Sequence, residues 1–263
     1  MTIPLSVCII ARDEERNLPR CLASVAWADE RIVVVDSNSR DATESIAREM
    51  GAEVSLHDYE GNLEQKRYAL EQAKHAWVFA LDADEAVTPT LADEIRRCVA
   101  DGEAAGYEVN RVTFHLGRWI RHGDFFPDWQ LRLFRREGAR YVGVNPHGRP
   151  EVPGTVLRLS GELQHWSYQD LADQVERIQE FSRVQAEELF DQGRRASLAD
   201  LVFHPPGRFL RAYLLKRGFL DGIPGFVIAA ATAFHVLLKY AKLWELERLR
   251  GPAAAPAVAP RAD

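Results

Sequence analysis

Three aspartates stand where apolar, strand-like runs of this sequence end. Asp36 closes one such run, and Asp82 and Asp84 follow the run Trp77–Leu81 as an Asp-Ala-Asp triplet. Two carboxylates at this spacing supply the hard oxygen ligands that Mg²⁺ or Mn²⁺ prefers, and such a cation can neutralise a departing diphosphate. The competing interpretation is that the triplet caps a helix expected after Pro89.

Asp36 suits a different contact. A carboxylate at the end of a buried strand can accept a hydrogen bond from a ribose hydroxyl or from a base N–H. The alternative is that Asp36 only caps the helix that begins near Ala42. The charged segment Ala11–Asn17 follows the first strand-like run, and this position favours a place in the same pocket over a solvated loop.

These residues need a sheet to bring them together. The first half of the chain alternates between short β-branched runs and helical patterns, which is typical of βαβ units. Strands are expected at residues 5–10, 32–35 and 77–81, and helices at about 17–27, from 42 onward and at 63–73. The pattern predicts an α/β fold with a mostly parallel sheet, which offers a nucleotide-sized crevice at the ends of its strands.

The middle of the chain, residues 106–165, is β-rich and carries many aromatic and arginine residues, so we expect it to face the acceptor substrate of a transfer reaction. Arg132 and Arg135 alternate there with apolar residues. This predicts a strand with a basic face suited to phosphate, or else an exposed strand edge. Asp128 follows Pro127, and by itself it is typical of a turn.

Composition excludes several classes of protein. The chain has 263 residues, 46% of them hydrophobic, which is enough for a core of ordinary size. Its net charge of −6 argues against binding to nucleic acid. The three cysteines show no CxxC spacing, which argues against disulfides and structural zinc. No secretory signal is apparent at the N-terminus, so we expect a cytoplasmic protein.

The C-terminal third has a different character. Leu171, Val175, Ile178, Phe181 and Val184 mark one face of an amphipathic helix. Residues 203–250 carry eight basic and three acidic side chains, a net charge of +5. Within them, the apolar run 223–238 is shorter than the about 20 residues of a bilayer crossing, which favours a core helix or a helix docked at a membrane surface. The Ala- and Pro-rich end, 251–263, is expected to be disordered.

Several motifs together resemble the family 2 glycosyltransferases of the GT-A fold, and especially those of the lipopolysaccharide core. The resemblance rests on Ser6–Ile10 with Glu14-Glu15 and Asn17-Leu18, on Val34–Thr43, on Gln65-Lys66-Arg67 and on Leu81–Glu85. It extends to Phe209–Gly225 and Lys239–Lys242, and so covers nearly the whole chain. Departures are Asp13 in place of the usual Asn, Asn38 in place of Gly, and Arg67 in place of Asn.

This resemblance implies roles for individual residues. Glu14 and Asp36 would contact the nucleoside, Lys66 the base or phosphates, and Asp82 and Asp84 the ribose and a divalent cation, Mg²⁺ or Mn²⁺. The phosphate contacts expected of Arg132 and Arg135 rest on their alternation with apolar residues and not on the resemblance.

The resemblance also extends to the acceptor side. It implies that Asp128, in Phe126–Arg135, is the catalytic base, with Asp124 the other carboxylate nearby. A histidine after a strand completes the metal site in several enzymes of this fold, and His165 is the candidate, ahead of His147. A purely structural histidine is the alternative.

Taken together, the sequence predicts a nucleotide-sugar-binding half at 1–105, an acceptor-side half at 106–168 and a helical, membrane-associating region at 169–250. The expected activity is inverting transfer of a sugar from a nucleotide diphosphate donor, UDP-sugar in particular, to a membrane glycolipid such as lipopolysaccharide core. The expected location is the cytoplasmic face of an anionic membrane. The alternatives are a transferase acting on polyprenyl phosphate and a non-catalytic subunit that binds nucleotide sugars.

Overall fold

A computed structural model describes residues 3–143 and 148–250, and within it the chain forms two compact units. The first unit contains residues up to 114 and 127–167, and the second contains 115–126 together with the chain from 168 onward. The expected acceptor segment 106–168 is therefore divided between the two units. His147 and the tail 251–263 lie outside the described residues.

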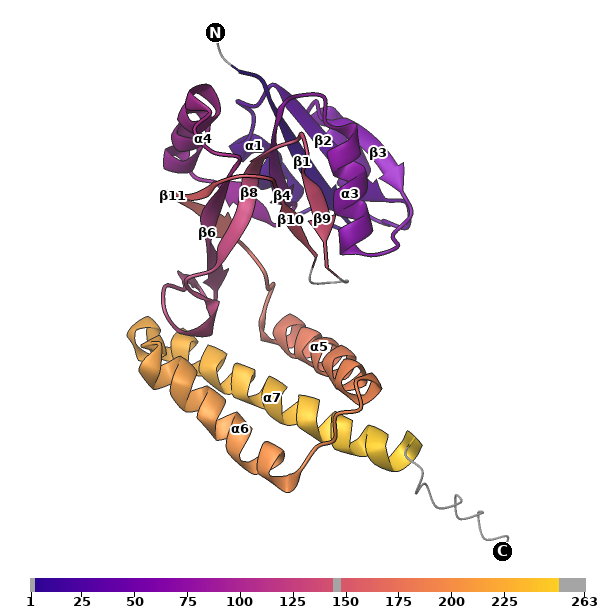
Figure 1. The fold of residues 1–263 in the computed structure, drawn as a ribbon, viewed down its shortest axis with the longest axis vertical. Helices are drawn as coiled ribbons and strands as arrows, with labels where there is room; N and C mark the ends of the chain where they lie inside the picture. The colour runs from indigo at the N-terminus through magenta and orange to yellow at the C-terminus, as the bar shows by residue number, and fades with distance from the viewer. Residues whose placement is uncertain (1–2, 144–147, 251–263) are drawn as a thin grey trace, which may run out of the picture. The chain divides into compact units, whose positions relative to one another are not determined.

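The first unit is an α/β structure, as the sequence predicts (Figure 1). Its strands are β1 (Leu5–Ala11), β2 (Glu30–Asp36), β3 (Glu53–His57), β4 (Trp77–Asp82), β5 (Glu85–Val87), β6 (Gly106–His115), β8 (Trp129–Arg135), β9 (Arg140–Val142), β10 (Arg149–Glu151) and β11 (Val156–His165). Its helices are α1 (Leu18–Ser24), α2 (Thr43–Glu49), α3 (Asn62–Gln72) and α4 (Pro89–Asp101). Strand β3 was not expected, because its residues are only half-buried at the sheet edge and lack a continuous apolar run.

The main sheet has the strand order β3-β2-β1-β4-β8-β6-β11-β5. Strands β1 to β4 pair in parallel, so their carboxyl ends share one edge. Strand β8 returns antiparallel to β4, with Trp77 opposite Arg135 and Phe79 opposite Leu133. The start of β8 therefore lies toward the end of β4 at which Asp82 stands.

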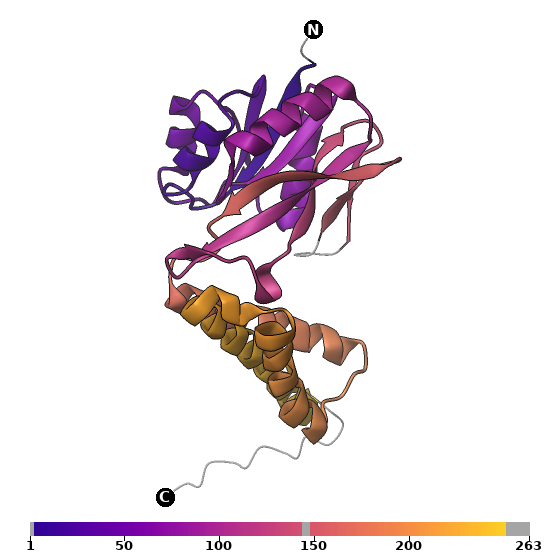
Figure 2. The same cartoon turned by 90° about the vertical axis from the view of Figure 1, so that its left-hand side faces the viewer.

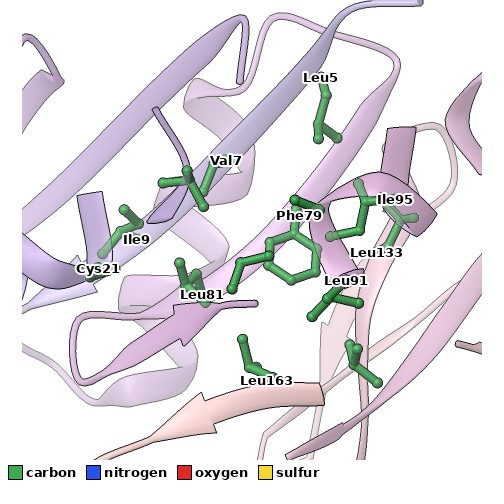
Figure 3. Packing of buried hydrophobic residues seen from close by; sticks show 14 of the residues in the cluster. Leu5, Val7, Ile9, Cys21, Phe79, Leu81, Leu91, Ile95, Leu133 and Leu163 are labelled. Carbon is green, nitrogen blue, oxygen red and sulfur yellow. The ribbon is translucent and has the colours of Figure 1, made fainter. Parts of the chain in front are cut away.

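Both faces of this sheet are covered, which explains why its central strands are apolar throughout. Helices α1, α2 and α4 pack on one face, around a core that includes Ile9, Phe79, Leu81 and Leu91 (Figure 3). Helix α3 and strand β9 cover the other face through Leu63 and Tyr141, among others.

The second unit is mainly helical, with α5 (Leu171–Asp191), α6 (Leu198–Leu210), a π-helical turn (Arg211–Leu215), a 3₁₀ turn (Gly218–Asp221) and α7 (Gly222–Arg250). The short strand β7 (Arg118–Trp119) and a 3₁₀ turn (Gly123–Phe125) also belong to it. Helix α7 packs against both α5 and α6, and it runs beside α6 in both views (Figures 1 and 2).

Two features of these helices differ from the sequence predictions. The inward face of α5 is Gln174, Ile178, Ser182 and Ala186 rather than the predicted apolar stripe, because Gln174 bonds to His115 and Ser182 to Lys242. Helix α7 is also longer than the apolar run suggested. By length and composition residues 218–250 could cross a membrane, and only 22% of their most apolar window is buried.

Strand β11, which ends in His165, lies very close to helix α4. A Cβ atom on Gly161 would stand 2.6 Å from the Leu91 Cα atom and 2.8 Å from its backbone nitrogen. The Glu94 side chain also accepts a hydrogen bond from the Gly161 N–H at 2.7 Å. Only glycine permits this approach of a strand to a helix backbone.

Gly161→Ala is therefore expected to destabilise the protein by about 1–3 kcal/mol, because α4 or β11 must move to admit the methyl group. Gly207→Ala is the matched control, since a Cβ atom at this helical position meets nothing within 4 Å. Thermal or urea unfolding of both variants measures the difference. Equal stability of the two variants would contradict the close contact between β11 and α4.

Candidate active site

A pocket opens at the carboxyl ends of β1, β2 and β4 in the first unit. The residues that line it are Ile10, Ala11, Arg12, Glu14, Asp36, Tyr59, Asn62, Gln65, Lys66, Asp82, Ala83, Asp84 and His165. Six of the predicted site residues are therefore brought together here: Glu14, Asp36, Lys66, Asp82, Asp84 and His165. The pocket combines four carboxylates with two basic side chains, Arg12 and Lys66, a composition suited to ribose hydroxyls and a divalent cation.

Asp36 is buried at the end of β2, with 1% of its surface exposed. Its Oδ1 atom accepts hydrogen bonds from the backbone N–H and the side-chain amide of Asn38, at 2.9 and 3.1 Å. Its Oδ2 atom lies 3.3 Å from Arg12 Nε and has no hydrogen-bond partner among the described residues. A buried carboxylate oxygen in this condition is suited to accept from a ligand. The residue before helix α2 is Ala42, so Asp36 is not its cap.

The loop after β1 is packed against the turn after β2, so it is not a freely solvated loop. Asp13 adopts φ of 52°, a conformation that Asp and Asn tolerate better than most residues. Its carboxylate accepts from the Arg40 backbone N–H at 2.7 Å. Glu14, which lines the pocket, accepts from the Asn17 side chain at 2.8 Å.

Asp82 is neutralised by two cations. Lys66 Nζ lies 2.8 Å from Oδ1, and Arg132 Nη2 lies 2.8 Å from Oδ2. Burial disfavours the charged form of Asp82, but the combined attraction of Arg132 and Lys66 outweighs it and holds the pKa of this carboxyl well below its usual range. The backbone N–H of Asp82 donates to the Glu85 side chain at 2.9 Å, which holds the main chain at the end of β4.

Asp84 has a different partner. Its Oδ2 atom lies 3.3 Å from His165 Nε2, at the end of β11. The Thr113 hydroxyl lies 3.4 Å from His165 Nδ1, and the Ser167 hydroxyl lies 3.0 Å from both ring nitrogens, so hydroxyl groups surround the imidazole beside Asp84. The cap of helix α4 is Thr88, which accepts from the Leu91 N–H. The Asp-Ala-Asp triplet is therefore not the cap of α4.

The Asp84 carboxylate and the His165 imidazole fit a divalent cation as a partial ligand set. Within residues 3–143 and 148–250, no group of three or more His, Cys, Asp or Glu side chains is arranged to hold a metal ion. Mg²⁺ in nucleotide sites is commonly held by one or two carboxylates, with substrate phosphates and water completing its shell. Asp84 and His165 are arranged for this incomplete kind of site.

Asp128 precedes β8 and lies toward the same sheet edge as Asp82. Its Oδ2 atom is 2.7 Å from Arg111 Nε and from Arg111 Nη2, and its Oδ1 atom accepts from Gln130 Nε2 at 2.6 Å. Its side chain thus pairs with a guanidinium and an amide. Asp124, the other carboxylate of this segment, is buried in the second unit and pairs with Arg208 and Lys216 at 2.9 and 3.0 Å.

The predicted basic face of β8 is wrong, because the register of β8 against β6 shifts between Leu131 and Leu133, which interrupts the regular alternation at Arg132. Arg132 is buried against Asp82 and Glu85, whereas Arg135 lies at the far end of β8, opposite Trp77. The Arg135 guanidinium stacks on Trp77 and donates to the Gly102 carbonyl. Arg135 is thus remote from the pocket. Arg132 pairs with Asp82 but does not itself line the pocket.

Sequence reasoning missed Glu85 and Arg111 as parts of this site. The fully buried Glu85 carboxylate lies 2.5 Å from Arg132 Nη2 and 3.2 Å from Arg111 Nη1. Glu85 directly follows the triplet, and this adjacency is the one available signal. It also missed Tyr59, whose ring makes a cation–π contact at 5.7 Å with Arg12 in the pocket wall.

Comparisons with known proteins agree with this geometry. Residues 6–153 match the family described as Glycosyl transferase family 2. The chain is 29% identical to the lipopolysaccharide core biosynthesis glycosyltransferase LpsC of Rhizobium meliloti, over 94% of each chain. It is also 29% identical to an uncharacterized glycosyltransferase of Rickettsia typhi, over 92% of this chain and 87% of the relative.

Among solved structures, S. aureus TarS in complex with UDP-GlcNAc aligns with 94% of this chain and 92% of its own, at 14% identity and a TM-score of 0.47. The family match spans more than half of the chain and contains the strands that form the pocket. This protein is therefore a member of glycosyltransferase family 2, with an α/β fold.

Proposed function

We propose that this chain transfers a sugar from a UDP-sugar to a hydroxyl group of a membrane glycolipid of the lipopolysaccharide core class, with inversion at the anomeric carbon. One observation carries the proposal: a single pocket gathers Asp36, the Lys66–Asp82 pair and the Asp84–His165 pair. The function named for the R. meliloti relative supports the acceptor class.

The donor would lie across the carboxyl ends of β1, β2 and β4. Asp36 Oδ2 is buried without a hydrogen bond and would accept from a ribose hydroxyl or from the ring N–H that uracil carries. Glu14 lies in the same wall of the pocket. Lys66, one-fifth exposed beside Asp82, is available to approach the diphosphate.

The reaction would be a direct displacement. The acceptor oxygen forms a bond to the anomeric carbon as the bond from that carbon to the diphosphate oxygen breaks, and the electron pair leaves with the diphosphate. The proton of the acceptor hydroxyl passes to the Asp128 carboxylate. When bound beside Asp84 and His165, a divalent cation would supply positive charge against the leaving diphosphate.

The second unit supports a membrane-bound acceptor and a peripheral location at the inner membrane face. The turn between α6 and α7 exposes large apolar side chains, namely Leu210, Leu214, Leu215, Phe219, Leu220 and Ile223. Arg211 and Arg217 are exposed among them, and the one carboxylate within residues 201–244, Asp221, is buried. Apolar and basic side chains without an exposed acid suit the surface of an anionic membrane.

If Asp84 and His165 hold a cation, Asp84→Ala should reduce transfer to background and abolish the effect of Mg²⁺ or Mn²⁺ on UDP affinity, since one of two protein ligands is lost. UDP titration with and without excess chelator measures this effect. Asp93→Ala, on the exposed face of α4, is the control. Full transfer by wild type in chelator would remove the metal from the mechanism.

Asp128→Asn should lower the single-turnover rate by about 10²–10⁴-fold, because the amide keeps the shape of the carboxylate but cannot accept the proton. UDP affinity should not change. The assay incubates purified protein with a panel of nucleotide sugars and a glycolipid extract, and product is found by mass spectrometry. A near-normal rate in this variant would favour an acceptor that is already an anion, such as polyprenyl phosphate.

The exposed turn between α6 and α7 should bind anionic vesicles in a salt-sensitive way. Replacing Arg211 and Arg217 with Gln should weaken vesicle binding in co-sedimentation by about 30-fold, at about 1 kcal/mol for each charge. Lys216 is left in place because it pairs with the buried Asp124. Arg194→Gln with Arg195→Gln removes the same charge from another exposed loop. Equal loss in both double variants would contradict docking through this turn.

A further inference from the structure

The first unit contains a continuous row of alternating charges that joins the donor pocket to Asp128. Its members, in spatial order, are Lys66, Asp82, Arg132, Glu85, Arg111 and Asp128. Neighbours in this row lie 2.5–3.2 Å apart. The row crosses from α3 to β4, β8, β5 and β6, so its order cannot be read along the chain.

We propose that Arg111 is a positioning residue for the transfer reaction, which holds the Asp128 carboxylate in place and is itself held by Glu85. The inference rests on the role of Asp128 proposed above. Two Arg111 nitrogens, Nε and Nη2, contact the same Asp128 oxygen, Oδ2, at 2.7 Å. Together these contacts fix the position of Oδ2, and the Gln130 amide holds Oδ1, so the carboxylate keeps one orientation.

The backbone reinforces this arrangement. The Arg111 N–H donates to the Asp128 carbonyl at 2.8 Å, and the Asp128 N–H donates to the Asn110 side chain at 2.9 Å. Strand β6 thus holds both the main chain and the side chain of Asp128. A third contact, from Arg111 Nη1 to Glu85, holds the guanidinium in place independently of Asp128.

These contacts identify the oxygen that would take the proton. A carboxylate oxygen has two acceptor positions, and Oδ2 uses both on Arg111. Oδ1 uses one on Gln130, which leaves one of its positions open, and the side chain as a whole is 29% exposed. The Asp128 Oδ1 atom is therefore the acceptor of the substrate proton.

Glu85 has a second consequence for the reaction. When Asp128 takes up a proton it loses its negative charge, and Arg111 would then lack a counter-ion on that side. Because Glu85 is fully buried and lies against both Arg111 and Arg132, the guanidinium remains paired throughout. The network can thus accept neutralisation of Asp128 without leaving a buried cation unpaired.

A double-mutant cycle tests this inference. Arg111→Gln, Asp128→Asn and the double variant are compared with wild type in single-turnover transfer, using the nucleotide sugar and glycolipid extract that give product with wild type. Arg111→Gln alone should slow transfer by about 10- to 100-fold, since the carboxylate loses its orientation. UDP affinity should stay within about twofold. In the Asp128→Asn background, the same change should slow transfer by less than about twofold, because residues that act as one unit are not additive.

Arg158→Gln is the matched control, since Arg158 makes an equally short ion pair, 2.8 Å, with Glu108 in the same sheet. It should leave the rate unchanged. If Arg111→Gln does not fold, the cycle uses Arg111→Lys, which keeps the charge but lacks the planar guanidinium. If Arg111→Gln still slows transfer by about 10- to 100-fold in the Asp128→Asn background, the positioning role is overturned. The role of Asp128 as the base then still stands. A near-normal rate in Asp128→Asn itself would instead overturn the proposed base.

Discussion

The organisation of the pocket depends on one buried interaction, in which Arg132 lies between the carboxylates of Asp82 and Glu85. Arg132 comes from β8, Asp82 from the end of β4 and Glu85 from β5, so the interaction fixes three strands relative to one another. An unpaired charge in this interior costs several kcal/mol, which strongly disfavours any register that separates the three groups. The geometry of the sheet edge therefore follows from charge pairing as much as from apolar packing.

The same interaction gives the two carboxylates of the Asp-Ala-Asp triplet different partners. Asp82 is committed to Lys66 and Arg132, which fixes its carboxylate and keeps it ionised. Asp84 pairs instead with His165, whose imidazole is held by neighbouring hydroxyl groups. Two carboxylates separated by one residue thus have different chemistry, because only one of them is in contact with permanent cations.

The second unit uses buried carboxylates for another purpose. Asp221 accepts hydrogen bonds from the backbone N–H groups of Arg121 and His122 at 3.0 and 2.8 Å, which ties residues 115–126 to the start of α7. Asp124 pairs with Arg208 and Lys216 in the same unit. Both carboxylates are therefore paired with groups of the second unit. The exposed turn after α6 consequently presents basic and apolar groups with no exposed carboxylate among residues 201–244.

The sequence by itself determined the α/β class, the strands that end in Asp36 and Asp82, and the family, because strand periodicity and short motifs are local properties. It did not determine that Arg132 is buried or that Arg135 lies at the end of β8 far from the pocket, so Arg135 was wrongly assigned to the pocket. Nor could it reveal Arg111, which lies 26 residues from Glu85 and 17 from Asp128 along the chain. Such partners are chosen by strand order and register, and the burial that makes their pairing obligatory exists only in the folded sheet.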